Sequence, residues 1–126
     1  MTDPERTRVV DHRGRRIILF DFSGITDPAH GLAEVSKATA FMAAQPCDGS
    51  HFTCTDVTAT RYDREIVEAC KAFSAHNRPY VKASAVVSDS TIHRAAISMI
   101  ALVTKRKLPV FETREAALDF LAAAER

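Results

Sequence analysis

The chain has few cysteines, and they follow no ligand or disulfide pattern. The 126 residues include three, Cys47, Cys54 and Cys70. An odd number with no close pair matches neither a disulfide framework nor a zinc site. The five histidines form no HxxxH or HExxH pair, and no cysteine lies at ligand spacing from one of them. We therefore expect a reduced, cytoplasmic protein with no metal and no cofactor.

Long apolar runs, phosphate-binding loops and a charge excess are also missing. The longest apolar stretch, residues 95–103, is far shorter than the roughly 20 residues of a membrane span. The first residues lack the apolar core of a signal peptide. No phosphate loop or G-x-S-x-G elbow occurs. Seventeen basic residues against 16 acidic ones give a net charge of +1, and the basic clusters 13–16 and 105–107 are not interleaved with aromatics. We therefore expect no nucleic-acid binding and no membrane span.

What is present is enough apolar material for a folded core. Hydrophobic residues make up 46% of the chain, and the length suits one domain. We expect a disordered tail over residues 1–6 and a single domain over 7–126. Hydrophobic patterns, caps and turns predict strands at 8–11, 16–22, 52–58, 80–87 and 108–111, and helices at 28–44, 64–77, 91–104 and 114–122.

The resulting order, β-β-α-β-α-β-α-β-α, predicts an α/β fold with a mixed sheet and helices packed against it. Strands that alternate with helices become parallel neighbours through right-handed crossovers. The Arg13-Gly14 pair reads as a tight hairpin turn, which adds one antiparallel strand at the start.

Four segments of the chain resemble a known family. They are residues 18–24, 55–63, 77–87 and 108–116, and together the resemblance covers about residues 8–122. The chain resembles the SpoIIAA-like proteins, the group that includes STAS domains, and most closely a bacterial branch labelled STAS/SEC14-like. The resemblance implies a SpoIIAA-like fold.

The same resemblance implies an interaction role. STAS domains are known mostly as protein–protein modules, and the best-studied ones antagonise anti-sigma factors. Their switch is a phosphorylated serine at the start of the second helix, and the matching stretch here is 63–66, where Asp63 fits but Arg64 and Glu65 replace the serines. The resemblance therefore implies an interaction module without this phosphoswitch.

Polar residues follow three of the predicted strands. Asp21 with Ser23, Asp56 with Thr58, and residues 88–89 should meet beyond the carboxyl ends of the parallel strands. Two carboxylates there can hold Mg²⁺ or transfer protons. The alternative is that both aspartates bind turn backbone amides. No pair shows nucleophile or acid–base spacing, so we expect no catalytic residues; an enzyme using Asp21, Asp56 or Lys82 remains the alternative.

Two single residues also invite a chemical interpretation. Lys82 lies mid-strand, on the predicted face of Tyr80, Ser84 and Val86. Buried, it would be a candidate base or nucleophile; the alternative is a lysine whose amine extends to water from a partly covered face. His93, in the first turn of the third helix, is expected to be an exposed helix residue.

The third predicted helix is apolar around most of its surface. We expect Ile92, Ala96, Met99 and Val103 to face the core. A second apolar face, which would form a homodimer or partner surface, comprises Ile97, Ile100, Ala101 and Leu102. The alternative is that this helix lies under the last helix.

The leading hypothesis is a module that binds another protein or itself. Its recognition edge would comprise Asp56, Thr58, Thr60, Arg61, Tyr62 and Asp63. The alternative function is a small-molecule or lipid carrier, with a pocket between the second and third helices over Phe73, Tyr80 and Met99.

Overall fold

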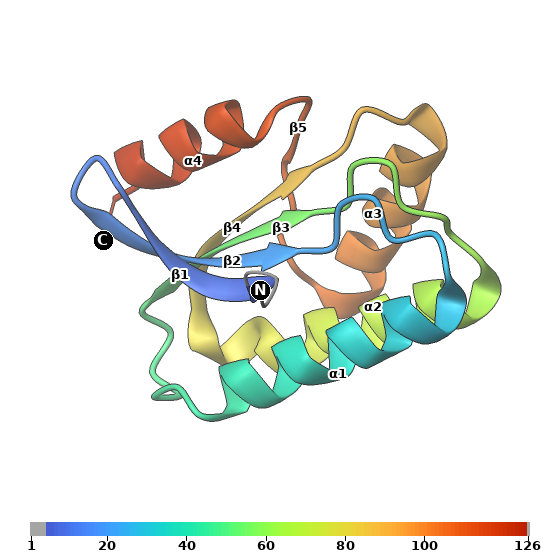
Figure 1. Cartoon of the computed structure of the whole chain (residues 1–126). Helices are drawn as coiled ribbons and strands as arrows, with labels where there is room; N and C mark the ends of the chain where they lie inside the picture. The colour runs from blue at the N-terminus through green and yellow to red at the C-terminus, as the bar shows by residue number, and fades with distance from the viewer. Residues whose placement is uncertain (1–4, 126) are drawn as a thin grey trace.

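The protein forms a mixed five-stranded sheet with helices on both faces (Figure 1), which confirms the predicted α/β class. The computed structural model describes residues 5–125, so most of the predicted tail, residues 1–4, lies outside it. The elements are β1 (Thr7–His12), β2 (Arg15–Asp21), α1 (Pro28–Ala43), β3 (His51–Asp56), α2 (Arg64–Asn77), η1 (Arg78–Tyr80), β4 (Val81–Val87), α3 (Thr91–Thr104), β5 (Val110–Phe111) and α4 (Arg114–Ala123). No helix within 5–125 is long and apolar enough to cross a bilayer.

Strand order in the sheet follows the chain, β1-β2-β3-β4-β5. β1 is antiparallel to β2, and the remaining neighbours are parallel. The hairpin turn has positive φ at Arg13 (51°) and Gly14 (79°), as a two-residue turn that matches the strand twist requires. Side-chain caps at Asp63, Ser90 and Thr113 begin α2, α3 and α4, at the starts predicted for these helices.

Two apolar cores lie on opposite faces of the sheet. The helices that cover them, α1 to α3 on one face and α4 on the other, are drawn in Figure 1. Along β2, Ile18 and Phe20 belong to the core under α1, α2 and α3, whereas Ile17 and Leu19 belong to the core under α4. All four side chains are at most 1% exposed. A continuous apolar run on a central strand therefore serves both cores, as expected when a sheet is covered on two sides.

The edge beside β4 departs from the prediction in two ways. β5 covers two residues instead of four, because Pro109 has no N–H with which to extend the ladder. In β4, His51 pairs with Val81 and Phe52 pairs with Ala83, so Lys82 is an extra residue at a bulge. The regular alternation that placed Lys82 beside Ser84 and Val86 is broken there, and Lys82 is exposed.

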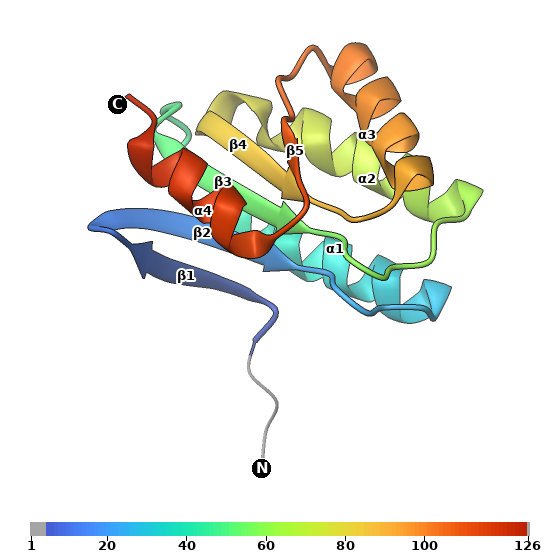
Figure 2. The same ribbon diagram turned by 90° about the horizontal axis from the view of Figure 1, so that it is seen from above.

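Most of the residues predicted for the two faces of α3 lie on the other face, although Leu102 is exposed as predicted. The buried face comprises His93, Ile97, Ile100 and Thr104, and the exposed one includes Ile92, Met99, Leu102 and Val103. Ile97 and Ile100 are therefore core residues and cannot contact a partner; Ala101 is half-buried and Leu102 exposed. The alternative position under α4 is also wrong, since α4 packs on the opposite face of the sheet (Figure 2).

Polar groups under the sheet explain this reversal. The buried face of α3 is apolar in the middle and polar at both ends, and each end meets a polar partner inside. His93 shares a hydrogen bond with Ser88, and Thr104 with Ser74. Hydrophobic periodicity predicts that polar residues such as His93 and Thr104 are exposed. It takes no account of hydrogen-bond partners that lie in other helices and strands.

Candidate functional site

Asp21, Asp56 and Arg114 form a charged cluster at the carboxyl ends of β2 and β3, here called the carboxylate cluster. Asp21 and Asp56 are register partners at the ends of their strands. Arg114, the first residue of α4, places Nη2 3.0 Å from Asp21 Oδ1 and 2.8 Å from Asp56 Oδ2, and its Nε donates to the same Asp56 oxygen at 2.9 Å. The two predicted carboxylates therefore meet, but a guanidinium lies between them.

Backbone amides also bind these carboxylates. Asp21 Oδ1 accepts from the Ser23 N–H at 3.1 Å and from the Ser23 hydroxyl. Asp56 Oδ1 accepts from the Thr58 N–H at 2.9 Å. This is the turn-binding alternative raised from the sequence, and it accounts for Asp21, Ser23, Asp56 and Thr58 together.

The N-terminal end of the described chain closes the cluster on its outer side. Arg6 donates from Nη1 to the carbonyls of Asp21 (3.1 Å) and Ser23 (2.8 Å). Arg8 Nη1 lies 3.7 Å from Asp21 Oδ2. Arg6 was expected to lie in the disordered tail, yet it holds the loop that follows β2.

These contacts favour the charged forms of Asp21 and Arg114. Burial disfavours the charge on Asp21, but the hydrogen bonds from Ser23 and the Arg114 charge outweigh it and lower the Asp21 pKa. Burial likewise opposes the charge on Arg114, while Asp56 and Asp21 raise its pKa. Among residues 5–125, no three His, Cys, Asp or Glu side chains gather as a metal site would require. The arrangement fastens α4 to β2 and β3.

Most of the predicted recognition edge is used inside the fold. The Thr60 hydroxyl donates to the Val57 carbonyl at 2.8 Å, and Asp63 caps α2 through the Ile66 N–H at 2.9 Å. Within residues 56–63 only Ala59 and Arg61 are exposed. The structure therefore does not gather these side chains into one exposed polar surface.

Tyr62 and His93 form a stacked pair that the sequence did not indicate. Their ring centroids lie 4.2 Å apart with an interplanar angle of 21°, and His93 is 7% exposed. Burial raises the Tyr62 pKa. The expectation that His93 is exposed is wrong. His93 lies on the buried face of α3, where it contacts Ser88 and Tyr62, whereas its neighbour Ile92 is exposed.

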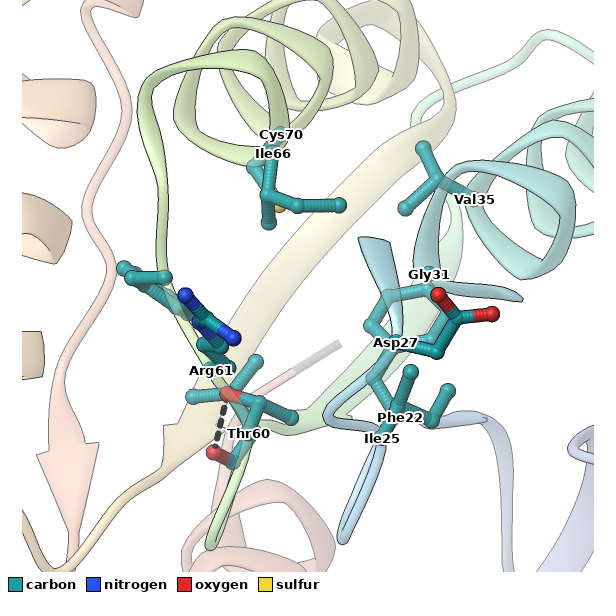
Figure 3. A pocket seen from close by; sticks show the side chains of 11 residues that line it. Phe22, Ile25, Asp27, Gly31, Val35, Thr60, Arg61, Ile66 and Cys70 are labelled. Carbon is teal, nitrogen blue, oxygen red and sulfur yellow. Dashed lines mark hydrogen bonds between the residues drawn. The ribbon is translucent and has the colours of Figure 1, made fainter. Parts of the chain in front are cut away.

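Two small hollows lie between the sheet and the helices. One, of about 30 Å³, lies between α1 and α2, with Ile25, Gly31 and Val35 on one side and Ile66 on the other (Figure 3). The other, of about 60 Å³, lies under α2 and α3 and includes Phe73, but neither Tyr80 nor Met99. Of the three residues expected to line a carrier pocket, one does.

The remaining candidate nucleophiles are in unsuitable surroundings. Burial raises the pKa of Cys54 to about 12 and that of Cys70 to about 11, which keeps both as thiols near neutral pH. Lys82 is exposed to solvent, which agrees with the alternative in which its amine extends to water from a partly covered sheet face.

A comparison of the chain with models of known protein families, with curated proteins and with solved structures finds no match.

Proposed function

We propose that this protein is a non-catalytic interaction module that pairs with a second copy of itself through the exposed side of α3. The observation that carries the proposal is the α3 face, defined as Ile92, Ala95, Met99, Leu102 and Val103. Ile92 is 78% exposed, Leu102 80% and Val103 56%. Contiguous apolar patches of this kind mark contact surfaces on proteins.

The chemistry of the α3 face favours a second copy. Arg94 is the only Lys, Arg, Asp or Glu in α3, and it is half-buried. In a two-fold interface the same patch meets itself, so an uncharged apolar face suffers no like-charge repulsion there. One helix face is small beside the roughly 800 Å² that each partner buries in a stable complex, so the dimer is expected to be weak.

The resemblance to STAS domains supports the same role. The β-β-α-β-α-β-α-β-α order and the absence of the phosphorylatable serine pair fit a SpoIIAA-like module that works by contact. An enzyme using Asp21, Asp56 or Lys82 has less support, because Arg114 occupies the space between the two carboxylates and Lys82 is exposed.

The test is sedimentation equilibrium over a wide range of protein concentrations. Wild type is expected to pass from monomer to dimer, and Leu102→Glu to raise the dissociation constant by about tenfold or more, since two buried carboxylates would face each other across the axis. Val9→Glu is the matched control, because Val9 is a 42% exposed apolar residue on β1. A wild type that stays monomeric, or equal effects of both substitutions, contradicts the proposal.

A second candidate function, small-ligand binding, rests on the hollow under α2 and α3. Its lining mixes apolar side chains with Thr53, Ser84 and Arg106. Its volume of about 60 Å³ is far below the roughly 300–1,000 Å³ of drug-sized pockets, so it would admit only a very small molecule. Native mass spectrometry of protein purified from its own cytosol tests this: a stoichiometric added mass supports a carrier, and a bare chain opposes it.

A further inference from the structure

An open groove runs along the first half of β4, on the side away from β3. Its volume is about 700 Å³, and its floor is residues 81–84. The loop 105–109 forms one wall, and Phe120 of α4 belongs to the other. Five cations line it, and we call it the basic groove; they are Arg78, Lys82, Lys105, Arg106 and Lys107.

The floor of the groove is a part of β4 with which β5 does not pair, and its last residue, Ser84, is 7% exposed. β5 pairs with β4 only at Val86 and Val87, in the second half of the strand (Figure 2). The N–H groups of Val86 and Ser88 both point to the β5 side, where they donate to Pro109 and Phe111. By the alternation of a strand, the Ser84 N–H points to the same edge, before the first residue of β4 that pairs with β5.

The charge in the groove has no internal counterpart. The lining contains no Asp or Glu, and none of its five cations forms an ion pair within residues 5–125. Arg106 donates to the Ser74 carbonyl and the Ser84 hydroxyl, both uncharged. Burial lowers the Arg106 pKa to about 10, which still leaves it charged at neutral pH. An anionic partner would supply the missing charge.

We propose that the basic groove binds an extended acidic segment of a partner protein, which adds as a strand beside the first half of β4. Main-chain hydrogen bonds to a free edge give affinity in this mode, and side-chain contacts give specificity. Carboxylates would face the five cations, and an apolar side chain would contact Phe120, which is 41% exposed.

The same features explain why the edge does not pair with another copy of itself. An exposed lysine and a bulge are the usual means by which proteins protect a free edge from self-association. Lys82 supplies both here. Edge-to-edge pairing of two copies would bring two cationic grooves together, whereas an acidic segment meets opposite charge. The proposal is independent of the α3 face, which lies on other residues.

A direct binding measurement tests the proposal. The probe is a fluorescein-labelled octapeptide of alternating Glu and Val, titrated with the protein and followed by fluorescence anisotropy. We expect saturable binding that weakens as salt rises, because ion pairs at the surface are screened. A peptide with Lys in place of Glu should not bind. Equal or stronger competition by an oligouridylate of matched charge would overturn the choice of a peptide.

Matched variants separate the groove from general basic charge. The double substitution Lys82→Glu with Lys107→Glu should lower affinity by about tenfold or more, since it reverses two charges of the groove. Arg61→Glu with Arg64→Glu reverses two exposed charges at the start of α2, which do not line the groove, and should change affinity by less than about twofold. Leu102→Glu should leave it unchanged, which separates this test from that of the proposed dimer. Equal losses in both double variants would overturn the proposal.

Amide hydrogen exchange separates strand addition from loose electrostatic contact. Without peptide, the Ser84 N–H should exchange faster than that of Ala85, whose N–H alternates toward β3. With saturating peptide, exchange at Ser84 should slow markedly. Binding without protection of Ser84 would overturn the added strand.

Discussion

The carboxylate cluster and the basic groove are both charged, but only one satisfies itself. At the carboxyl ends of β2 and β3, Arg114 lies between Asp21 and Asp56, and backbone amides take further carboxylate oxygens. Along the first half of β4, five cations line a groove to which residues 5–125 contribute no carboxylate. The first region uses its charge to hold the fold together; the second leaves its charge for something else to neutralise.

This contrast shows that the residues that stand out in the sequence are not the ones that are free to contact a partner. Paired aspartates at strand ends look like a site in the sequence, whereas a basic cluster that follows a helix does not. In the structure the aspartates fasten α4 to the sheet, while Lys105 and Lys107 line an open groove with Lys82. Whether a charge can act on a partner depends on what the fold places beside it.

The largest expected effect is the loss of Arg114. Arg114→Met removes the shared cation: Asp21 keeps Arg8 at 3.7 Å, but Asp56, whose side chain is only 6% exposed, loses its cationic partner. We expect a loss of about 3 kcal/mol in the free energy of unfolding, as when one member of a buried ion pair is removed. Urea unfolding followed by circular dichroism measures it.

Two further variants sharpen that result. Asp56→Asn in the Arg114→Met background should recover part of the loss, because one unpaired charge disappears. Arg64→Met, on an exposed position of α2, should change stability by less than about 0.5 kcal/mol. Equal losses for Arg64 and Arg114 would show that Arg114 does not hold the cluster.

An effect of intermediate size is expected for the stability of the protein at low pH. The Asp21 pKa is lowered in the folded protein, so its stabilising contribution is complete above the ordinary value of 3.8 and is lost as pH falls through the folded value. Stability of the wild type should therefore decline on the acid side, and Asp21→Asn should decline less. Urea unfolding at a series of pH values measures both curves; parallel curves would contradict the assigned ion pair.

The strand and helix order was predictable because its signals are local. Gly14 tolerates the hairpin turn, Pro28 begins α1, and Asp63, Ser90 and Thr113 cap their helices through backbone amides a few residues away. The meeting of Asp21 and Asp56 was also predictable, because parallel strands end at one edge. None of these needs knowledge of distant side chains.

What was missed depends on contacts between distant segments. Arg114 is 58 residues from Asp56 in the chain, and nothing in its neighbourhood marks it as their partner. The buried side of α3 depends on Ser88 and Tyr62, which lie outside the helix and contact His93. The basic groove exists because Pro109 stops β5 short, which leaves a strand edge that residue patterns do not report.

The smallest expected effect is the removal of charge from the basic groove, and it completes the contrast. Lys82→Met with Lys107→Met takes away two cations that have no ion-pair partner in the described part of the chain. We expect a change below about 0.5 kcal/mol, toward greater stability at low salt because like charges separate, and no change at high salt. Urea unfolding at two salt concentrations decides it. A loss in the free energy of unfolding comparable to that of Arg114→Met would mean that these lysines stabilise the fold. Fewer charges of the groove would then be free to bind an acidic partner.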